Sequence, residues 1–301
     1  MMRKDYLRDF RGLFGMVALL LLLGMASTAL AANFFEGFET SGLFDFGNGV
    51  VHTSPGGSSI ETDYAEGINA SSGNFLARLS VQPTANVDDS GNAACAPGSE
   101  DCIGPFTNWG LAYDVDTGVP MKSGGSVTSV DIYLDVNFAA AHSDYRFDWD
   151  SALLDSQGNF LQDYIFNVGT GNPSQPVACA PASGGYFVIS ASNNSQRENA
   201  YPQNPGRMPQ CIATSGWYTF EHIFKPLNND LGVHMEILNA QKVEVAIWAM
   251  HPTCMGTQVT NHLCTNGALL PFSAVGANAY GWFDDQEIDS LAIDNLSLTQ
   301  E

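Results

Sequence analysis

The sequence predicts an all-β protein that folds as a two-sheet antiparallel β-sandwich. Several short runs alternate apolar and polar residues with a period of two, and stretches rich in Gly, Pro and Asn separate them. No segment of useful length after residue 31 shows a helical period. Because no change of composition marks a boundary, we expect one domain over residues 32–301.

The clearest strand lies at residues 127–136, where aliphatic side chains alternate with mostly polar ones. The even positions are expected in the core: Val130, Ile132, Leu134 and Val136. The polar positions are expected to face outward: Asp131, Tyr133 and Asp135. After a turn at residues 148–159, a second strand is predicted at 163–168, and we expect the two strands to belong to one antiparallel sheet.

Further strands are predicted at residues 74–79, 109–115, 185–191, 216–224, 232–238, 242–250, 280–283 and 290–298. In the strand at 216–224, one face carries Tyr218, Phe220, His222 and Phe224, and the other carries Trp217, Thr219, Glu221 and Ile223. We therefore expect His222 to be a hydrogen-bonded core residue and not a catalytic base. The proline-rich segment 196–210 is expected to cross a surface.

The amino terminus predicts a secretory signal peptide at residues 1–31. Four basic residues precede the apolar run 13–25, and Ala29-Leu30-Ala31 follows it as a cleavage site. The alternative is a membrane anchor, but a spanning helix needs roughly 17 to 25 apolar residues, and the run 13–25 is shorter than that. The mature protein is therefore expected to be secreted and soluble.

The mature chain is strongly acidic. Removal of residues 1–31 leaves 7 basic against 30 acidic residues, a formal net charge of −23. Such a field repels phosphate backbones and anionic lipid, so it argues against nucleic acid and membranes as partners. Neutral polysaccharides and divalent cations are the partners that this charge favours.

Six cysteines in a chain expected to enter an oxidising compartment predict disulfide bonds that tie long loops. They are Cys95, Cys102, Cys179, Cys211, Cys254 and Cys264. Sequential pairing is the simplest of the 15 connectivities that six cysteines allow, and the sequence does not decide among them. No spacing suits a zinc site, so a structural role is favoured over a metal or redox role.

Several phrases together resemble a family of secreted, mostly bacterial proteins of unassigned activity. The phrases are GINASSGNFLARL, GPFTNWG, SVDIYLDV, LQDYIFNVG, SGWYTFEHIF and YGWFDDQEIDSLAIDNLSL. The resemblance covers most of the mature chain and implies a jelly-roll sandwich of the concanavalin A-like or carbohydrate-binding-module type. It supports the fold more than an activity, because one fold hosts many functions.

Catalysis on such a fold would need paired carboxylates or a base beside cationic groups. The acid pairs on shared strand faces are Asp131 with Asp135, Asp148 with Asp150, and Glu287 with Asp289. A glycoside hydrolase or a polysaccharide lyase is therefore an alternative, but solvated faces of an acidic protein are the simpler explanation. Glu287-Ile288-Asp289 is similar to the acid-x-acid core of concanavalin-like glucanases. The further Glu that follows this core two or three residues later in that family is missing here.

A structural calcium ion is expected between the first and last segments, because carboxylate oxygens suit this cation. Its candidate ligands are Glu36, Glu39 and Asp294. In the last strand, Leu291 and Ile293 share one parity whereas Leu296 and Leu298 share the other, so a β-bulge is predicted at Asp294-Asn295.

The leading functional hypothesis is a non-catalytic module that binds a neutral carbohydrate or another surface. Sugar binding needs exposed aromatic faces beside hydrogen-bonding groups. We expect Tyr133 and Trp149 to be the exposed aromatic residues, with Asp131 and Asp135 as polar partners. A second alternative is a structural extracellular protein without a small ligand.

Overall fold

The computed structural model of the protein describes residues 34–39, 45–46, 49–50, 58–62, 68–73, 75–79, 106–108, 119–171, 181, 184–193, 208–250, 263–264, 270–284, 287–288 and 291–301. The signal segment 1–31, the strand predicted at 109–115 and most of the proline-rich segment lie outside these residues. So do Asp289 and the cysteines Cys95, Cys102, Cys179 and Cys254.

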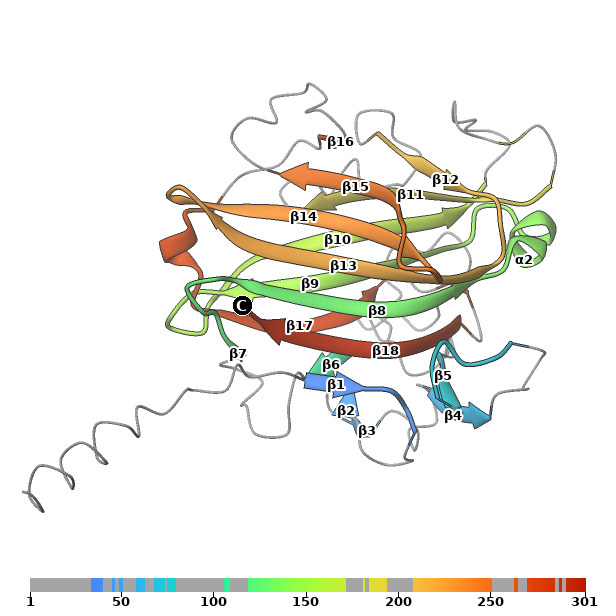
Figure 1. The fold of residues 1–301 in the computed structure, drawn as a ribbon, viewed down its shortest axis with the longest axis horizontal. Helices are drawn as coiled ribbons and strands as arrows, with labels where there is room; N and C mark the ends of the chain where they lie inside the picture. The colour runs from blue at the N-terminus through green and yellow to red at the C-terminus, as the bar shows by residue number, and fades with distance from the viewer. Residues whose placement is uncertain are drawn as a thin grey trace, which may run out of the picture. The chain divides into compact units, whose positions relative to one another are not determined.

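In the described residues, the larger of two main sheets has nine strands. Its order is β16-β15-β14-β13-β8-β18-β5-β4, with β1 paired to β18 (Figure 1). The bounds are β1 Phe34–Glu36, β4 Ser58–Thr62, β5 Phe75–Leu79, β8 Ser126–Leu134, β13 Gly216–Leu227, β14 Asp230–Asn239, β15 Glu244–Met250, β16 Leu263–Cys264 and β18 Leu291–Gln300. Neighbouring strands are antiparallel except the short β15 and β16 pair.

The smaller main sheet has seven described strands in the order β12-β11-β10-β9-β17-β6, with β7 paired to β17. The bounds are β6 Phe106–Asn108, β7 Val119–Pro120, β9 Arg146–Leu154, β10 Phe160–Thr170, β11 Phe187–Asn193, β12 Gln210–Ile212 and β17 Ala277–Asp284. A separate two-stranded sheet pairs β2 Asp45–Phe46 with β3 Gly49–Val50.

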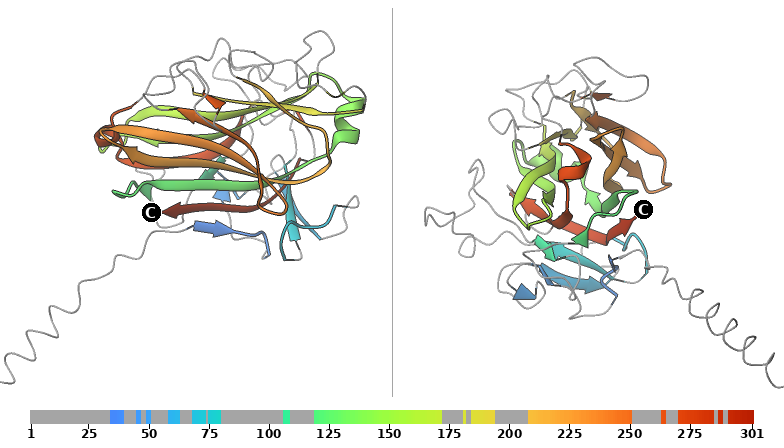
Figure 2. Two further views of the ribbon diagram at one scale, coloured as in Figure 1. Left: turned by 45° about the horizontal axis from the view of Figure 1, so that its top comes forward. Right: turned by 90° about the vertical axis from the view of Figure 1, so that its left-hand side faces the viewer.

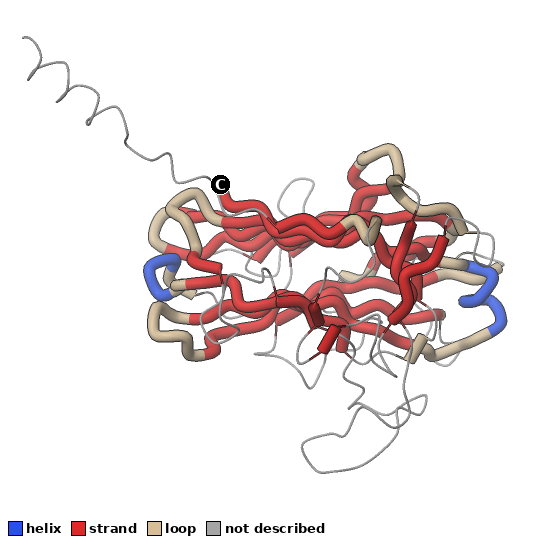
Figure 3. The backbone as a smooth tube through the Cα atoms, turned by 90° about the horizontal axis from the view of Figure 1, so that it is seen from below, coloured by secondary structure: helices blue, strands red, loops and turns tan. Residues whose placement is uncertain are grey.

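The two main sheets pack face to face, as the sequence predicted. Phe166 of β10 meets Phe220 of β13 with ring centroids 5.2 Å apart, and Tyr164 of β10 meets Phe224 of β13 at 5.3 Å. Figure 3 shows the two layers of strands, and Figure 2 shows them from two further directions. Burial of these rings between the layers contributes to the apolar core.

Strands β8 and β13 pair in the register that their alternating patterns require. Val130 and Ile132 of β8 and Phe220 of β13 are fully buried on the inner face. Asp131 and Thr219 pair directly on the opposite face. All the predicted strands within the described residues are present, with ends that differ from the prediction by a few residues.

The expectation that residues 127–136 and 163–168 share one sheet is wrong. β8 belongs to the larger sheet, whereas β10 pairs with β9 and β11 in the smaller one. β9 occupies most of the region that was expected to be a turn. The turn itself is limited to residues 155–159, where Asp155 Oδ1 accepts hydrogen bonds from the N–H groups of Gln157 and Asn159 at 2.8 and 2.9 Å.

A short helix that the pattern did not predict follows β8. This helix, α2, spans Val136–Ala141, and Asp135 is its N-cap because its Oδ1 accepts a hydrogen bond from Asn137 N at 2.9 Å. Val136 therefore starts a helix and is half-buried, instead of extending the core row of β8. The described part of the chain also contains a 3-10 helix, η4, at Phe272–Ala274.

The prediction that Trp149 is exposed is wrong. Its side chain is 0% exposed and lies in the core, with its ring centroid 4.8 Å from that of Phe283. The residues before and after it, Asp148 and Asp150, point to the other face of β9, because successive strand residues alternate. Their acidity suggested a solvated segment, but the aromatic side chain between them faces inward.

His222 is a core residue, as predicted. Its ring is fully buried between the sheets, and its Nδ1 lies 3.3 Å from the hydroxyl of Thr128. Burial lowers the pKa of His222 to about 3, so the imidazole is neutral at physiological pH.

Among the described residues, no helix is both long and apolar enough to span a membrane. Cys211 of β12 takes part in a disulfide bond. The sequential pairing of the six cysteines stays a prediction, since four of them lie outside the described residues.

Candidate functional site

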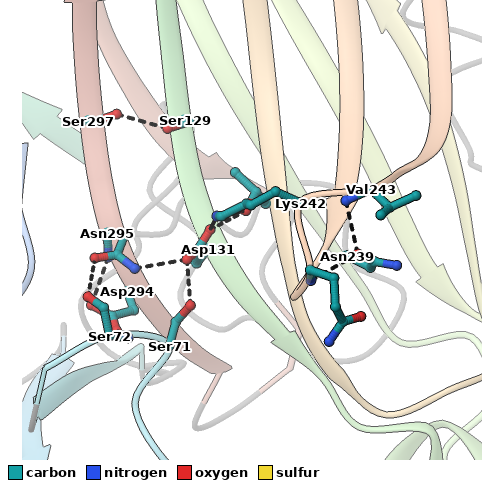
Figure 4. A network of polar contacts seen from close by, with 12 residues as sticks. Ser71, Ser72, Ser129, Asp131, Asn239, Lys242, Val243, Asp294, Asn295 and Ser297 are labelled. Carbon is teal, nitrogen blue, oxygen red and sulfur yellow. Dashed lines mark hydrogen bonds and ion pairs between the residues drawn. The ribbon is translucent and has the colours of Figure 1, made fainter.

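The carboxylate of Asp131 is the centre of a polar cluster on the outer face of the larger sheet (Figure 4). Asp131 is only 2% exposed. Its Oδ1 accepts a hydrogen bond from the Thr219 hydroxyl and lies 3.3 Å from Lys242 Nζ. Its Oδ2 accepts from Ser71 Oγ at 2.5 Å and from Asn295 Nδ2 at 2.9 Å. Four side chains from separate segments therefore converge on one buried charge.

The bulge predicted in the last strand is confirmed and supplies one of these donors. The register of β18 against β8 shifts between Asp294 and Ser297, and Asn295 adopts a left-handed conformation with φ 49°. Asp294 becomes fully buried, and its Oδ1 accepts the N–H of Asn295 at 2.8 Å. The extra residue turns the Asn295 amide toward Asp131.

Residues 68–73 form one wall of the cluster and are held to the sheet by side chains. Ser72 N donates to Asp294 Oδ2 at 3.0 Å, and Ser72 Oγ donates to Asn295 Oδ1 at 2.7 Å. Trp217 Nε1 of β13 donates to the Asn69 carbonyl at 2.7 Å. The segment therefore bridges β13 and β18 on the outer face.

The turn between β14 and β15 forms the opposite wall. Asn239 Oδ1 accepts the N–H groups of Gln241 and Val243, each at 3.0 Å. This arrangement sends Lys242 over β13, where its Nζ donates to Thr219 Oγ1 at 2.6 Å before it reaches Asp131.

Two aromatic side chains lie beside the cluster on the same face. Tyr133 of β8 and Trp217 of β13 are cross-strand partners, and both are half-buried. Their ring centroids are 5.5 Å apart in an edge-to-face arrangement. Of the two aromatic residues predicted to be exposed, Tyr133 therefore lies at this surface and Trp149 does not.

Asp135 is held by contacts with its neighbours. Besides Asn137 N, its Oδ1 accepts from Asn137 Nδ2 at 3.1 Å and from Ser215 Oγ at 3.2 Å. The first turn of α2 and the segment before β13 are thereby joined at the end of β8. Its predicted contact with a ligand stays a prediction.

Of the three candidate calcium ligands, Glu36 at the end of β1 and Asp294 in β18 are buried, whereas Glu39 is exposed. Glu36 Oε1 accepts the N–H of Phe38 at 2.6 Å. A Cβ added at Gly73 would collide with the Glu39 carboxylate, so Glu39 lies against the same turn that Asp294 binds. The oxygen chemistry fits calcium. In the described residues, however, no three acidic, histidine or cysteine side chains form a group that could hold a metal.

The buried carboxylates have perturbed acidity. Burial raises the pKa of Asp294 to about 7, and the Asp131 carboxylate acts in the same direction, while N–H donors from Ser72 and Asn295 lower it. Burial also raises the pKa of Glu36 against the opposing Phe38 N–H. Burial therefore favours the protonated forms of Asp294 and Glu36.

The acid pairs that a hydrolase would need are inaccessible or engaged where they are described. Asp148 and Asp150 share the outer face of β9 and are both buried. Asn167 Nδ2 donates to Asp148 Oδ2 at 2.7 Å, and Ser192 Oγ donates to Asn167 Oδ1 at 2.8 Å. Glu287 is also buried, and its Oε2 accepts the N–H of Arg146 in β9 at 2.9 Å.

Several residues of the cluster were not predicted from the sequence. Trp217 and Thr219 had been placed together on the face of their strand opposite His222, and pairing that face with the polar face of β8 would have found them. Lys242 carries no such signal, because its position depends on the turn geometry. Comparison of the chain with models of known protein families gives no match, and comparison with curated proteins gives none either.

Proposed function

We propose that the protein is a secreted, non-catalytic β-sandwich that binds a neutral glycan on the outer face of its larger sheet. The observation that carries the proposal is the half-exposed pair of Tyr133 and Trp217 beside a fixed polar cluster. Aromatic faces stack on the apolar faces of sugars, and nearby polar groups bind their hydroxyls.

The surroundings of the aromatic pair support this function. Trp217 is held in place by its bond to the Asn69 carbonyl, and the Asp131 cluster occupies the next row of the same strands. Fixed side chains lose little conformational entropy when a ligand binds. The burial of Asp148 and Asp150 weighs against the alternative of a glycoside hydrolase or lyase.

A structural calcium ion is part of the proposal. Glu36, Glu39 and Asp294 would supply its oxygen ligands and would join the first and last segments of the domain. A cation there would offset the negative charge of the buried acids.

A glycan array run beside an assay for reducing sugars and unsaturated products tests the function. The expected result is binding without product. Trp217→Ala should abolish binding, whereas Tyr145→Ala should leave it intact. Tyr145 is a matched control because it is also half-buried, and its ring packs against Phe138 and His142 away from the cluster. Product formation, or equal binding by both variants, would contradict the proposal.

A further inference from the structure

Lys242 occupies a backbone conformation that a lysine does not favour. Its φ is 56°, in the left-handed region, and Asn239 fixes the turn around it. Lys242 N donates to the Asn239 carbonyl at 2.8 Å, and Asn239 N donates to the Val243 carbonyl at 2.9 Å. Gly and Asn adopt this region at lower cost, since a larger side chain crowds the backbone. What lysine adds at this position over Gly or Asn is its long, positively charged side chain.

The side chain reaches the cluster but remains open to solvent. Two contacts of Nζ hold the ammonium, one with Thr219 Oγ1 and one with Asp131 Oδ1, which Figure 4 shows. The side chain is nevertheless 58% exposed. An ammonium group has three N–H donors, so one donor remains for a ligand after these two contacts.

Asp131 has the complementary role of positioning this lysine. Both of its oxygens already accept hydrogen bonds, Oδ1 from Thr219 and Oδ2 from Ser71 and Asn295. A ligand would have to displace these donors to reach the carboxylate. An ion pair with one exposed partner adds little stability, so the pair serves orientation better than stability.

The free donor lies at a suitable distance from the aromatic pair. Thr219 and Trp217 are two residues apart on one face of β13, as are Asp131 and Tyr133 on β8. A strand rises about 3.4 Å per residue, so the two rows are roughly 7 Å apart. A sugar ring packed on the aromatic row would direct hydroxyl groups toward Lys242.

The charge around the lysine selects the class of ligand. Asp131 pairs with its positive charge, and Glu221 and Glu236 face each other across the next row of strands. Burial and these carboxylates raise the pKa of Glu221. Because these acids oppose the Lys242 charge, a sugar carboxylate gains little from the lysine, whereas a hydroxyl can still accept its remaining donor.

We propose that Lys242 is the specificity-determining hydrogen-bond donor of this surface, and that it reads a hydroxyl of a neutral sugar. The inference rests on the proposed function, because it assumes that the aromatic pair binds a glycan. It goes further by naming the donor, the role of Asp131 and the exclusion of uronic acids.

Calorimetric titration with defined hexasaccharides tests it. The probes are neutral β-1,4-glucan, β-1,3-glucan and β-1,4-xylan, and acidic polygalacturonate and alginate. Lys242→Met removes the donors and should weaken binding of the neutral probe about tenfold or more. Lys242→Arg should restore most of the affinity. Lys225→Met is the matched control, because Lys225 is exposed and paired with Glu301 at 3.0 Å, about 20 Å along β13 from Thr219.

The possible outcomes separate the two proposals. Binding of a neutral probe that falls in Lys242→Met alone supports the inference. Binding that is lost in Trp217→Ala but stays within twofold in Lys242→Met overturns the inference and leaves the proposed function standing. Tighter binding of the uronic acid probes, weakened by salt, overturns the assignment of a neutral ligand. Absence of binding to any probe overturns the proposed function itself.

Discussion

Replacement of Asp131 by alanine should destabilise the protein by about 2–4 kcal/mol. The buried hydroxyl of Thr219 would lose its acceptor while it keeps its contact with Lys242 Nζ, and a buried donor without an acceptor costs about 1–3 kcal/mol. Ser71 and Asn295 are partly buried, so part of their lost bonding returns as hydration. The Lys242 contribution is discounted because that side chain is 58% exposed. Asp131→Ala also removes the hydrogen bond that attaches residues 68–73 to β8. This loss adds to the cost at Thr219, and together they give the expected cost of about 2–4 kcal/mol.

Urea denaturation and calorimetry would measure this change. For a domain of this size each kcal/mol lowers Tm by about 2–4 °C, so the expected decrease is roughly 4–16 °C. Asp135→Ala is the comparison, since Asp135 is a half-buried helix cap on the same segment, and loss of a cap costs about 1 kcal/mol. If Asp131→Ala destabilised the protein no more than Asp135→Ala, the cluster would not be a stabilising centre and this reasoning would be refuted.

Three further predictions concern protons and calcium. Because the folded pKa of Asp294 is about 7 against 3.8 unfolded, its contribution is full below pH 4 and is lost as pH rises through 7. Relative to Asp294→Asn, chelated wild-type protein should lose up to about 3 kcal/mol between pH 4 and 7.5 in urea unfolding, and parallel profiles would contradict this. The folded pKa of His222, about 3 against 6.5 unfolded, predicts the opposite slope, with stability lost as pH falls from 6.5 toward 3. His222→Gln should remove about 1.4 kcal/mol per pH unit of that acid dependence, and an unchanged slope would mean that the histidine is not buried in solution. Calcium added to chelated protein should raise Tm in wild type and not in Glu36→Gln, and absence of a rise in wild type would exclude the calcium site.

The fold was largely predictable because most strands have one apolar face and one polar face. β8 and β13 alternate cleanly, since their outer face is polar while Val130 and Phe220 lie in the core. β9 was missed because both of its faces are buried, one by Trp149 and the other around Asp148. Its acids therefore resembled a solvated turn. The assignment of β8 and β10 to different sheets depends on contacts far apart in the chain, which local periodicity does not contain.

The site was predictable only in the part that lies on one strand. Asp131 and Tyr133 follow from the alternation of β8, and the bulge at Asp294 follows from the change of parity in β18. Thr219 and Lys242 join Asp131 only after strands and a turn are placed in space. Sequence patterns describe faces within an element, whereas this cluster is made of side chains from five separate segments.

The backbone conformation of residues at the cluster bears on the proposed function more directly than the raised pKa values of its carboxyl groups do. Three non-glycine residues with left-handed backbone lie at or beside it: Phe38, with φ 57°, Lys242, with φ 56°, and Asn295, with φ 49°. Left-handed residues other than Gly and Asn cost roughly 1–2 kcal/mol each, and such costs concentrate at functional sites. At Phe38 and Asn295 the side chains of buried or bulged acids compensate by accepting the backbone N–H. At Lys242 the backbone N–H donates to the Asn239 carbonyl at 2.8 Å, and the side-chain contacts belong to an exposed lysine, where their stabilisation is weak. The proposed contact of Lys242 with a sugar hydroxyl would account for the part of the backbone cost that these contacts do not offset.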